Sequence, residues 1–251
     1  AAWLFRVPIV LVEPNAIPGM ANRLVGRFAR LIFVAFDNAS SYFNSAKVIK
    51  YGVPVRKVIR EAKHELKDLQ NTFTIFVFGG SQGAKRLNDS MKDAVRGLSD
   101  LKDRLKIIHQ TGSAESVTEI RGIYDRVGIE SQVFGFTDRI WDCYRKADFV
   151  VARSGAATVA ELSALAMPSA LVPYPYAADD HQTANADALF KSGGALIIRD
   201  KECTGPRLSI LIREVVTKPE KLMAMHQALL SMKSFDASKR IVGKCMDIMA
   251  A

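Results

Sequence analysis

The stretch that most constrains the fold is residues 73–85, with the sequence FTIFVFGGSQGAK. Phe73 to Phe78 is an almost continuous run of aromatic and β-branched residues, which is typical of a buried strand in a parallel sheet. A glycine-rich turn follows at once, and helical spacing begins at Lys85. Glycines let the backbone approach a ligand closely, and a helix N-terminus offers N–H groups and a favourable dipole. The stretch therefore predicts an anion-binding turn.

This turn does not specify its ligand. No Gly-Lys-Ser/Thr closes it, so it is not the phosphate loop of the nucleoside triphosphatases. A tight strand-to-helix turn without any ligand is the alternative interpretation, and the stretch alone leaves both open.

From residue 73 onward, predicted strands and helices alternate. Strands are expected at 73–78, 105–109, 132–136, 148–152, 168–172 and 195–198. Such alternation predicts an α/β fold with a parallel sheet covered on both faces. Ligands of these sheets bind beyond the carboxyl ends of the strands. We therefore expect the loops 79–84, 110–113, 136–138, 153–158 and 173–182 to surround one crevice.

The first part of the chain predicts a smaller α/β unit. Short strands are expected near 9–12, 31–36 and 47–49, with a helix at 20–29. Gly52 and Pro54 favour a linker at 51–58, before a charged helix near 61–69. The first residues resemble the end of a helix that leads into a strand, so we expect a further segment upstream. The linker divides the chain into a first unit, 1–57, and a second unit from 58 onward, and the last predicted helix is near 237–249.

Composition narrows the class of protein. The 251 residues carry a net charge of +9, which suits a phosphate-bearing substrate, an anionic membrane surface or nucleic acid. Nucleic acid ranks last because the aromatic signatures of RNA-binding modules are missing. Cys143, Cys203 and Cys245 are far apart, which favours a reducing compartment without disulfides. Neither they nor the four histidines show the spacing of a metal site.

A second strand-to-helix loop, residues 153–161, has the sequence RSGAATVAE. Its backbone N–H groups can hold an anion or a sugar hydroxyl. A helix is expected to follow at 159–165, with Glu161 in its first turn, where a carboxylate can support the N-terminal cap. It can equally accept hydrogen bonds from the two hydroxyls of a ribose, as the acidic residue of dinucleotide sites does. Both interpretations stay open.

The loop at 173–185 is polar but lacks the pattern of a catalytic triad. The next helix is expected near 184–192, and Asp179 and Asp180 are expected to cap it rather than to bind a metal. His181 and Gln182 suit the recognition of sugar hydroxyls, although His181 is equally interpreted as a surface histidine. Asn15 and Arg56 have ordinary interpretations as a turn residue and a linker charge.

Seven motifs in order decide between these interpretations: EPNAIPGMANR, GVPVR, FGGSQGAKRLN, HQTG, VFGFTD, ADFVVARSGAATVAE and PYPYAADDHQTANA. Together they resemble the MurG family of bacterial N-acetylglucosaminyltransferases, over essentially the whole chain. The resemblance implies a GT-B fold of two Rossmann-like domains, with the N-terminal one incomplete. Residues 1–57 would be the remnant of the N-terminal domain on the acceptor and membrane side, and 58–235 would be the UDP-GlcNAc-binding domain. A C-terminal helix at 236–251 would pack back on the first domain. It implies inverting transfer of GlcNAc from UDP-GlcNAc to the C4 hydroxyl of the muramoyl residue of lipid I, giving lipid II, without metal or cofactor. It also implies peripheral binding to the cytoplasmic face of the bacterial inner membrane.

The resemblance implies roles for individual residues, by motif. The diphosphate would contact Ser81, the backbone of Gly80, Gln82 and Gly83, and Arg56. The uracil would lie against Phe136 and the backbone of Thr137, and the ribose against Glu161. Ala156, Ala157 and Thr158 would border the sugar and phosphate, and Arg153 would support its loop. GlcNAc hydroxyls would be read by His181, by Gln182 and, from the other domain, by Asn15.

The sequence departs from the family pattern at two places. Where the family usually has His-Glu-Gln-Asn, this chain has Val12-Glu13-Pro14-Asn15. A first glycine-rich loop, of the kind HxGTGGHxxPA, is expected upstream and would hold the acceptor diphosphate and the catalytic base. Two alternatives to the transferase therefore stay open. One is a UDP-sugar-binding domain, or donor subunit, that needs a separate acceptor domain. The more remote one is an enzyme like the UDP-GlcNAc 2-epimerases.

Overall fold

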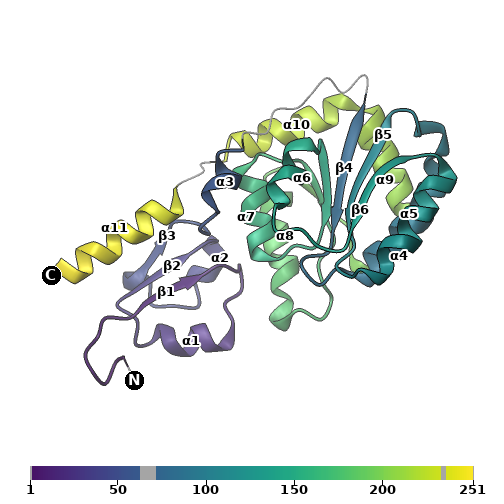
Figure 1. Cartoon of the computed structure of the whole chain (residues 1–251). Coiled ribbons are helices and arrows are strands. Elements are labelled where there is room, and N and C mark those ends of the chain that lie inside the picture. Colours follow the sequence, from purple (N-terminus) through teal and green to yellow (C-terminus); the bar gives the residue numbers. More distant parts are fainter. Residues whose placement is uncertain (1, 63–71, 233–235, 251) are drawn as a thin grey trace.

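The computed structural model describes residues 2–62, 72–232 and 236–250, which form two parallel sheets with helices around them (Figure 1). The prediction of a parallel α/β fold is confirmed. In order, the elements before residue 62 are β1 (Val10–Glu13), α1 (Met20–Gly26), β2 (Leu31–Val34), α2 (Asp37–Ser40), a 3-10 turn (Ser45–Lys47), β3 (Val48–Lys50) and α3 (Lys57–Arg60).

The smaller sheet has the order β1-β2-β3. Val10 lies opposite Leu31, and Ile32 lies opposite Val48. A small apolar cluster of Ala29, Ile32, Val34 and Ala39 packs beneath β2. The sheet is short because each strand has only three or four residues.

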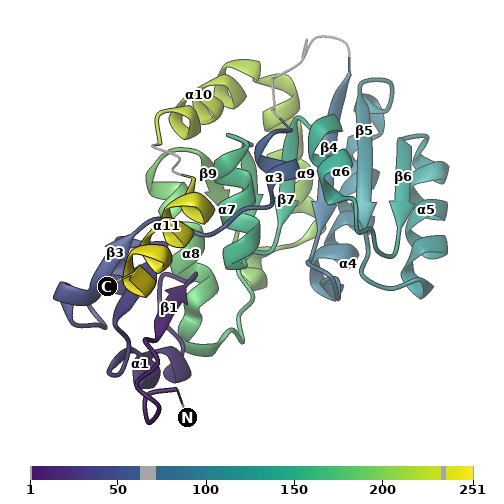
Figure 2. The same ribbon diagram turned by 60° about the vertical axis from the view of Figure 1, so that its left-hand side comes forward.

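The larger sheet has the order β6-β5-β4-β7-β8-β9, all parallel. Its strands are β4 (Phe73–Phe78), β5 (Leu105–Gln110), β6 (Glu130–Phe134), β7 (Phe149–Ala152), β8 (Ser169–Leu171) and β9 (Ala195–Ile197). Its helices are α4 (Lys85–Ala94), α5 (Glu115–Val127), α6 (Ile140–Lys146), α7 (Ala156–Ala164), α8 (His181–Lys191), α9 (Gly205–Thr217) and α10 (Pro219–Leu230). Further 3-10 segments lie at Val95–Leu101, Ala178–Asp180 and Asp200–Glu202. Figure 2 shows the sheet with helices on both sides.

Strand β4 explains why the sheet is buried on both faces. Phe73, Ile75 and Val77 belong to the apolar cluster that also contains residues of α4, α5 and α9. Phe76 and Phe78 belong to the opposite cluster, formed with α6, α7 and α8. Because successive side chains of a strand point to opposite faces, an apolar run without polar alternation requires cover on both sides.

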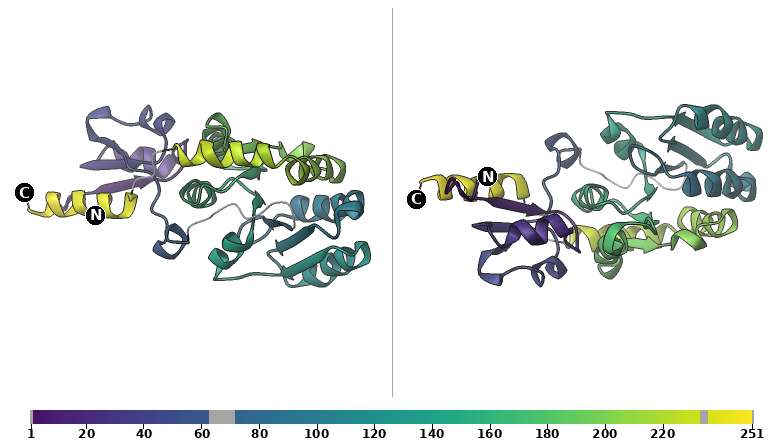
Figure 3. Two further views of the ribbon diagram at one scale, coloured as in Figure 1. Left: turned by 90° about the horizontal axis from the view of Figure 1, so that it is seen from above. Right: turned by 90° about the horizontal axis from the view of Figure 1, so that it is seen from below.

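The remaining segments extend from these two units. Helix α11 (Ala237–Ala250) lies beside the smaller sheet (Figure 3). The Arg240 guanidinium lies over the Tyr51 ring, 5.6 Å from its centroid. The prediction of a helix end before β1 is wrong, since residues 2–6 form turns. Most of the charged helix predicted near 61–69 lies outside the described residues. None of the helices in the described ranges has the length and apolar character needed to cross a bilayer.

Candidate donor-binding site

Three helices begin at the carboxyl ends of neighbouring strands. Helix α4 follows β4, α7 follows β7 and α8 follows β8. In the described part of the chain, the N-cap residue of each of these helices makes no side-chain hydrogen bond to the N–H groups of its helix. Their N-termini therefore offer N–H groups and positive dipole ends at one edge of the sheet, which is the arrangement that binds a phosphate group.

Glycine is required at position 83, in the loop before α4. Gly83 has φ +74°, and a Cβ there would lie 2.0 Å from the Thr111 carbonyl oxygen. Gly112 also lies close to Gly83, since a Cβ on Gly112 would lie 2.0 Å from the Gly83 nitrogen. The Gln110 side chain adds a hydrogen bond from Nε2 to the Gly80 oxygen, at 3.1 Å. The loop is therefore held in one conformation by the neighbouring strand-to-helix turn, the HQTG motif.

A cavity of about 1030 Å³ lies beside this loop. Its lining includes Gly80, Ser81, Gln82, Gly83, Arg153 and Gln182 among the predicted site residues. Tyr174, Tyr176, Asp89, Asp200 and Thr204 also line it. Three of the five loops that were predicted to surround one crevice therefore line this cavity, namely 79–84, 153–158 and 173–182.

Arg153 organises the wall of this cavity. Its guanidinium is largely buried and donates from Nη1 to the Val172 and Pro173 carbonyls, at 3.0 and 3.1 Å. The same nitrogen pairs with the Asp200 carboxylate at 2.6 Å. Arg153 thus fixes the start of the 173–182 loop, in line with the supporting role that the resemblance implies.

Glu161 lies in a second group of residues. Its side chain accepts a hydrogen bond from the Tyr144 hydroxyl at 2.9 Å and pairs with the Arg56 guanidinium at 3.5 Å. Burial raises the pKa of Glu161, although both partners act in the opposite direction. Arg56 also lies over the Trp141 ring, 5.5 Å from its centroid. The linker before α3 thus contributes a cation to the carboxylate on α7.

The expectation that Glu161 lies in the first turn of its helix is wrong. Helix α7 begins at Ala156, three residues before the predicted start at Val159. Its first turn therefore contains no acidic residue. Support of the N-terminal cap is thereby excluded for Glu161. Ala156, Ala157 and Thr158 form that first turn instead.

Helix α8 also begins earlier than predicted, at His181. His181 and Gln182 therefore lie in its first turn rather than in the loop. The imidazole Nδ1 of His181 is 2.7 Å from the Ala178 oxygen, and Gln182 Oε1 accepts from the Tyr174 N–H at 3.0 Å. Both side chains are half-buried beside the N-terminus of α8.

Asp179 and Asp180 do not cap α8 as predicted. Asp180 occupies the cap position, but its carboxylate accepts from the Thr183 hydroxyl at 2.7 Å. The Asp179 carboxylate pairs with Arg23 of α1 at 2.9 Å. Both residues have φ +52°, a left-handed conformation that aspartate tolerates better than most residues.

The remaining predicted residues lie at two other places. Phe136 is 63% exposed in the loop after β6, and the adjacent Thr137 hydroxyl accepts from the Arg139 N–H at 3.1 Å. Asn15 follows β1 and accepts, through Oδ1, from the Asn185 side chain at 3.2 Å. Asn15 thus lies against α8 although it belongs to the smaller unit.

Sequence reasoning missed three contributing residues. Tyr144 and Trp141 of α6 contact Glu161 and Arg56, and Asn185 of α8 contacts Asn15. The pattern that could have identified Asn185 is a polar residue among Ala184, Ala186 and Leu189 on a helix face expected to be apolar. Burial and the neighbouring carboxylate raise the pKa of Tyr144 well above its usual value, so its hydroxyl stays a donor.

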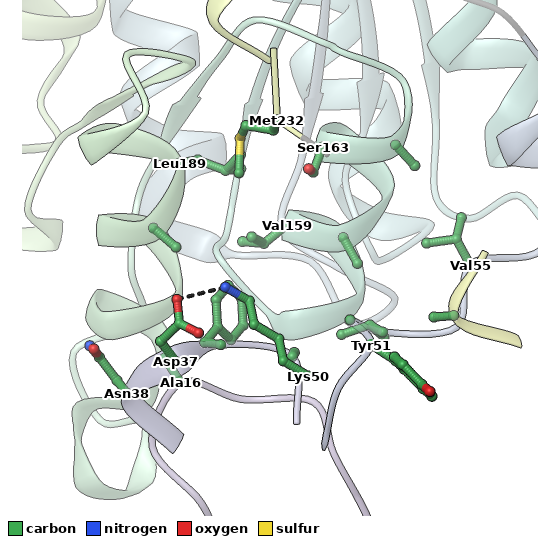
Figure 4. Close-up of a pocket in the computed structure, with 18 of the residues that line it drawn as sticks. Ala16, Asp37, Asn38, Lys50, Tyr51, Val55, Val159, Ser163, Leu189 and Met232 are labelled. Atoms are coloured by element: carbon green, nitrogen blue, oxygen red, sulfur yellow. Dashed lines mark hydrogen bonds and ion pairs between the residues drawn. The ribbon is translucent and has the colours of Figure 1, made fainter. Parts of the chain in front are cut away.

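A second cavity, of about 600 Å³, lies between the two units (Figure 4). Ala16, Tyr51 and the Asp37–Lys50 ion pair line it from the smaller unit, and Val159, Ser163 and Leu189 line it from α7 and α8. The predicted donor-site residues do not line it. Within the ranges that the structure describes, no group of three or more His, Cys, Asp or Glu side chains could hold a metal ion.

Comparison with known proteins gives a consistent assignment. The family model of the glycosyltransferase family 28 C-terminal domain matches residues 74–241. A relative from Myxococcus xanthus, named UDP-N-acetylglucosamine–N-acetylmuramyl-(pentapeptide) pyrophosphoryl-undecaprenol N-acetylglucosamine transferase, is 38% identical over 99% of this chain and 65% of its own length. A relative of the same name from Geobacter sulfurreducens is 37% identical over 96% of this chain and 67% of its own length. This chain thus spans about two thirds of the length of such relatives.

Solved structures agree with this assignment. The crystal structure of Acinetobacter baumannii MurG superposes with a TM-score of 0.81 and 27% identity, over 98% of this chain and 69% of that one. A putative UDP-N-acetylglucosamine 2-epimerase from Listeria monocytogenes has a TM-score of 0.71 at 13% identity, over 99% of this chain and 70% of that one, and shows the shared fold alone. The resemblance expected from the seven motifs is confirmed, and this chain belongs to the MurG family, within glycosyltransferase family 28.

Proposed function

We propose that this chain binds UDP-GlcNAc and takes part in inverting transfer of GlcNAc to the C4 hydroxyl of the muramoyl residue of lipid I, giving lipid II. One observation carries the proposal. In the described part of the chain, the N-termini of α4, α7 and α8 lie at one edge of the sheet beside the glycine-rich loop, and none has a side-chain cap. The names of the curated relatives supply the donor and acceptor.

Each part of the donor has its own proposed contacts. Ser81, the Gly80–Gly83 backbone and Arg56 would bind the diphosphate, and Phe136 with Thr137 would bind the uracil. Glu161 would accept hydrogen bonds from the ribose hydroxyls, since Tyr144 and Arg56 already orient its carboxylate. His181, Gln182 and Asn15 would read the sugar, with Arg153 holding the loop.

The energetic role of the site is electrostatic. The bond between the sugar and the phosphate breaks with UDP as an anionic leaving group. Backbone N–H groups and helix dipoles fixed in advance stabilise that developing charge without reorganising. The proposal assigns the catalytic base to none of the described residues.

We also propose the domain division, with residues 1–57 on the acceptor and membrane side, 58–235 as the donor domain, and the helix at 236–251 returning to the first. The contact of Arg240 with Tyr51 supports the return of the final helix to the first unit.

Peripheral binding to the cytoplasmic face of an anionic membrane is part of the proposal. The smaller unit exposes large apolar side chains, and the Trp3 and Phe28 rings lie 5.4 Å apart within this patch. Its members are Trp3, Leu4, Phe5, Met20, Leu24 and Phe28. Arg6, Arg27 and Arg30 follow or neighbour these residues in sequence, and each nearby cation adds roughly 1 kcal/mol of attraction to an anionic surface. The chain should therefore sediment together with vesicles of phosphatidylglycerol, and it should stay in the supernatant with neutral vesicles.

Two measurements test the proposed activity. Incubation with radiolabelled UDP-GlcNAc and a lipid I analogue should give labelled lipid-linked disaccharide. Calorimetric titration with UDP separates the alternatives, because binding without turnover supports a donor-binding module that needs a separate acceptor domain. Absence of both binding and transfer would contradict either function.

A further inference from the structure

The side chain of Asn185 joins the two units at a fully buried position. It is 0% exposed, and its side chain makes three hydrogen bonds to residues outside α8. Its Oδ1 accepts from the Ala16 N–H at 2.8 Å, and its Nδ2 donates to Asn15 Oδ1 at 3.2 Å and to the Ser154 carbonyl at 3.3 Å. One amide on α8 thus connects the segment after β1 with the loop after β7.

On the side of the smaller unit, Asn15 is held from both ends of its amide. The Glu13 carboxylate is buried, and its Oε1 accepts from the Asn15 N–H at 2.8 Å and from Asn15 Nδ2 at 3.2 Å. Its Oε2 accepts from Asn22 Nδ2 of α1 at 2.8 Å. Since Nδ2 of Asn15 is bound to Glu13 and Oδ1 to Asn185, the orientation of this side chain is fixed.

On the other side, the same chain of bonds reaches Gln182. The Ser154 carbonyl accepts from Asn185, and the Ser154 hydroxyl donates to the Gln182 carbonyl at 2.8 Å. The continuous series is therefore Glu13, Asn15, Asn185, Ser154 and Gln182. Buried amide networks of this kind are rigid when every member has its partners.

A second, exposed connection between the units is weaker. Arg23 of α1 pairs with Asp179 at 2.9 Å, but the two side chains are 34% and 49% exposed. Solvent and salt screen such pairs, so they contribute little. The buried amide, rather than this ion pair, is the contact that can set the position of the segment at 13–16.

We propose that Asn185 is a positioning residue, which places Asn15 relative to Gln182 and so determines how well the site distinguishes UDP-GlcNAc from UDP. This inference rests on the proposed function, because it assumes that Asn15 and Gln182 face the sugar. Asn185 itself is buried behind them and contacts neither the uracil site nor the glycine-rich loop. Its removal should therefore weaken the sugar-dependent part of donor affinity and spare the nucleotide-dependent part.

The test compares the dissociation constants of UDP and UDP-GlcNAc by calorimetry. In Asn185→Ala, UDP affinity should change by less than about twofold, whereas the gain in affinity from UDP to UDP-GlcNAc should fall about tenfold, as expected for the loss of one or two neutral hydrogen bonds. Asn15→Ala should lose the same gain. The double variant should be no worse than either single one, because the two residues act through one contact.

Two further variants keep the result interpretable. Asn185→Asp is nearly isosteric and keeps the acceptor for the Ala16 N–H, but it sets an oxygen against the Asn15 and Ser154 oxygens, so it should also lose the gain. His226 lies on α10, and its Nδ1 is 2.7 Å from the Ala166 oxygen. His226→Ala removes this buried contact, and it should lower the melting temperature without changing the ratio of the dissociation constants of UDP and UDP-GlcNAc.

The outcomes separate the two proposals. If UDP binds and both Asn185 variants keep the full gain for UDP-GlcNAc, the positioning role is overturned and the proposed function stands. If the effects of Asn15→Ala and Asn185→Ala add in the double variant, the two residues act separately and the role is likewise overturned. If the unaltered chain binds neither ligand, the proposed function fails and this inference fails with it.

Discussion

The two units of this molecule differ in how completely their sheets are covered. The larger sheet has apolar clusters on both faces, and Phe76, Val77 and Phe149 at its centre are fully buried. The smaller sheet has one small cluster around Ile32 and Val34 and leaves large apolar side chains at the surface nearby. A sheet packed on both sides can hold loops rigidly, so the preorganised part of the site belongs to the larger unit.

The contact between the units differs again. It combines a buried amide network, a few ion pairs and a cavity of about 600 Å³. A close-packed interior has few voids of this size. Apolar contact also contributes, since Phe36 and Val55 pack against the apolar cluster of the larger unit. The cavity interrupts this interface, and relative movement of the two units is the default expectation.

The largest expected effect concerns the loop that the larger unit holds rigid. Gly83→Ala combines a left-handed backbone with a Cβ 2.0 Å from the Thr111 oxygen, so we expect it to abolish UDP binding. It should also lower the free energy of unfolding by about 2–3 kcal/mol, measured by urea denaturation. Gly122→Ala, in α5, is the control, because nothing lies within 4 Å of the added Cβ and this residue lies outside the proposed site. Equal behaviour of the two variants would contradict a rigid loop.

The next effect concerns the carboxylate that the linker and α6 orient. Glu161→Gln should weaken UDP binding about 10- to 100-fold at pH 8, since hydrogen bonds to a charged acceptor are the stronger kind. It should weaken 2′-deoxy-UDP binding less, because that ligand lacks one of the two hydroxyls. Glu119→Gln, on the exposed surface of α5, is the control. A uniform loss for both nucleotides would contradict contact with the ribose.

The pH dependence of binding follows from the same residue. Burial raises the pKa of Glu161, and the ribose hydroxyls need the ionised form as acceptor. UDP affinity should therefore decrease as the pH falls, beginning above the ordinary titration range of a glutamate. Titrations of UDP at several pH values check this, and Glu161→Gln should remove that part of the dependence. An unchanged profile in the variant would assign the effect to another group.

A smaller effect concerns the stability of the larger unit. His109 is buried between Tyr124 and Asn88, and burial lowers its pKa from 6.5 to about 3. In the unfolded chain the imidazole takes up a proton near pH 6.5, so the folded state loses stability as the pH falls below that value. Between pH 7.5 and 5.5 this amounts to about 1.4 kcal/mol. Urea denaturation at both values measures it, and His109→Gln should show a smaller difference.

The smallest effect is expected for the exposed connection between the units. Asp179→Asn removes the charge that pairs with Arg23 and suits the left-handed backbone at this position, so it should change the free energy of unfolding by less than about 1 kcal/mol. The difference from the unaltered chain should shrink further at 0.5 M salt. A larger or salt-independent effect would show that this pair, and not the Asn185 amide, carries the contact between the units.

Much of the fold could be predicted because the strands of the larger sheet are short apolar runs with clear turns between them. The helix starts at Ala156 and His181 were predicted too late. Gly155 has no side chain that could mark the first start, and the Asp180 carboxylate binds the Thr183 hydroxyl rather than the N–H groups of its helix. A start without a side-chain cap is itself the feature that suits phosphate binding. The partners of Glu161 and Asn15 could not be predicted. Tyr144 and Asn185 are distant from them in sequence, and only the packing of α6 and α8 brings them into contact.

The central claim is that the carboxyl edge of the larger sheet binds a uridine diphosphate. Calorimetric titration of the 251-residue chain with UDP tests it most directly, with thymidine diphosphate as the comparison ligand. The account predicts one site per chain, with weaker binding of thymidine diphosphate because its sugar lacks the 2′-hydroxyl. Absence of UDP binding by a chain that melts cooperatively would contradict it.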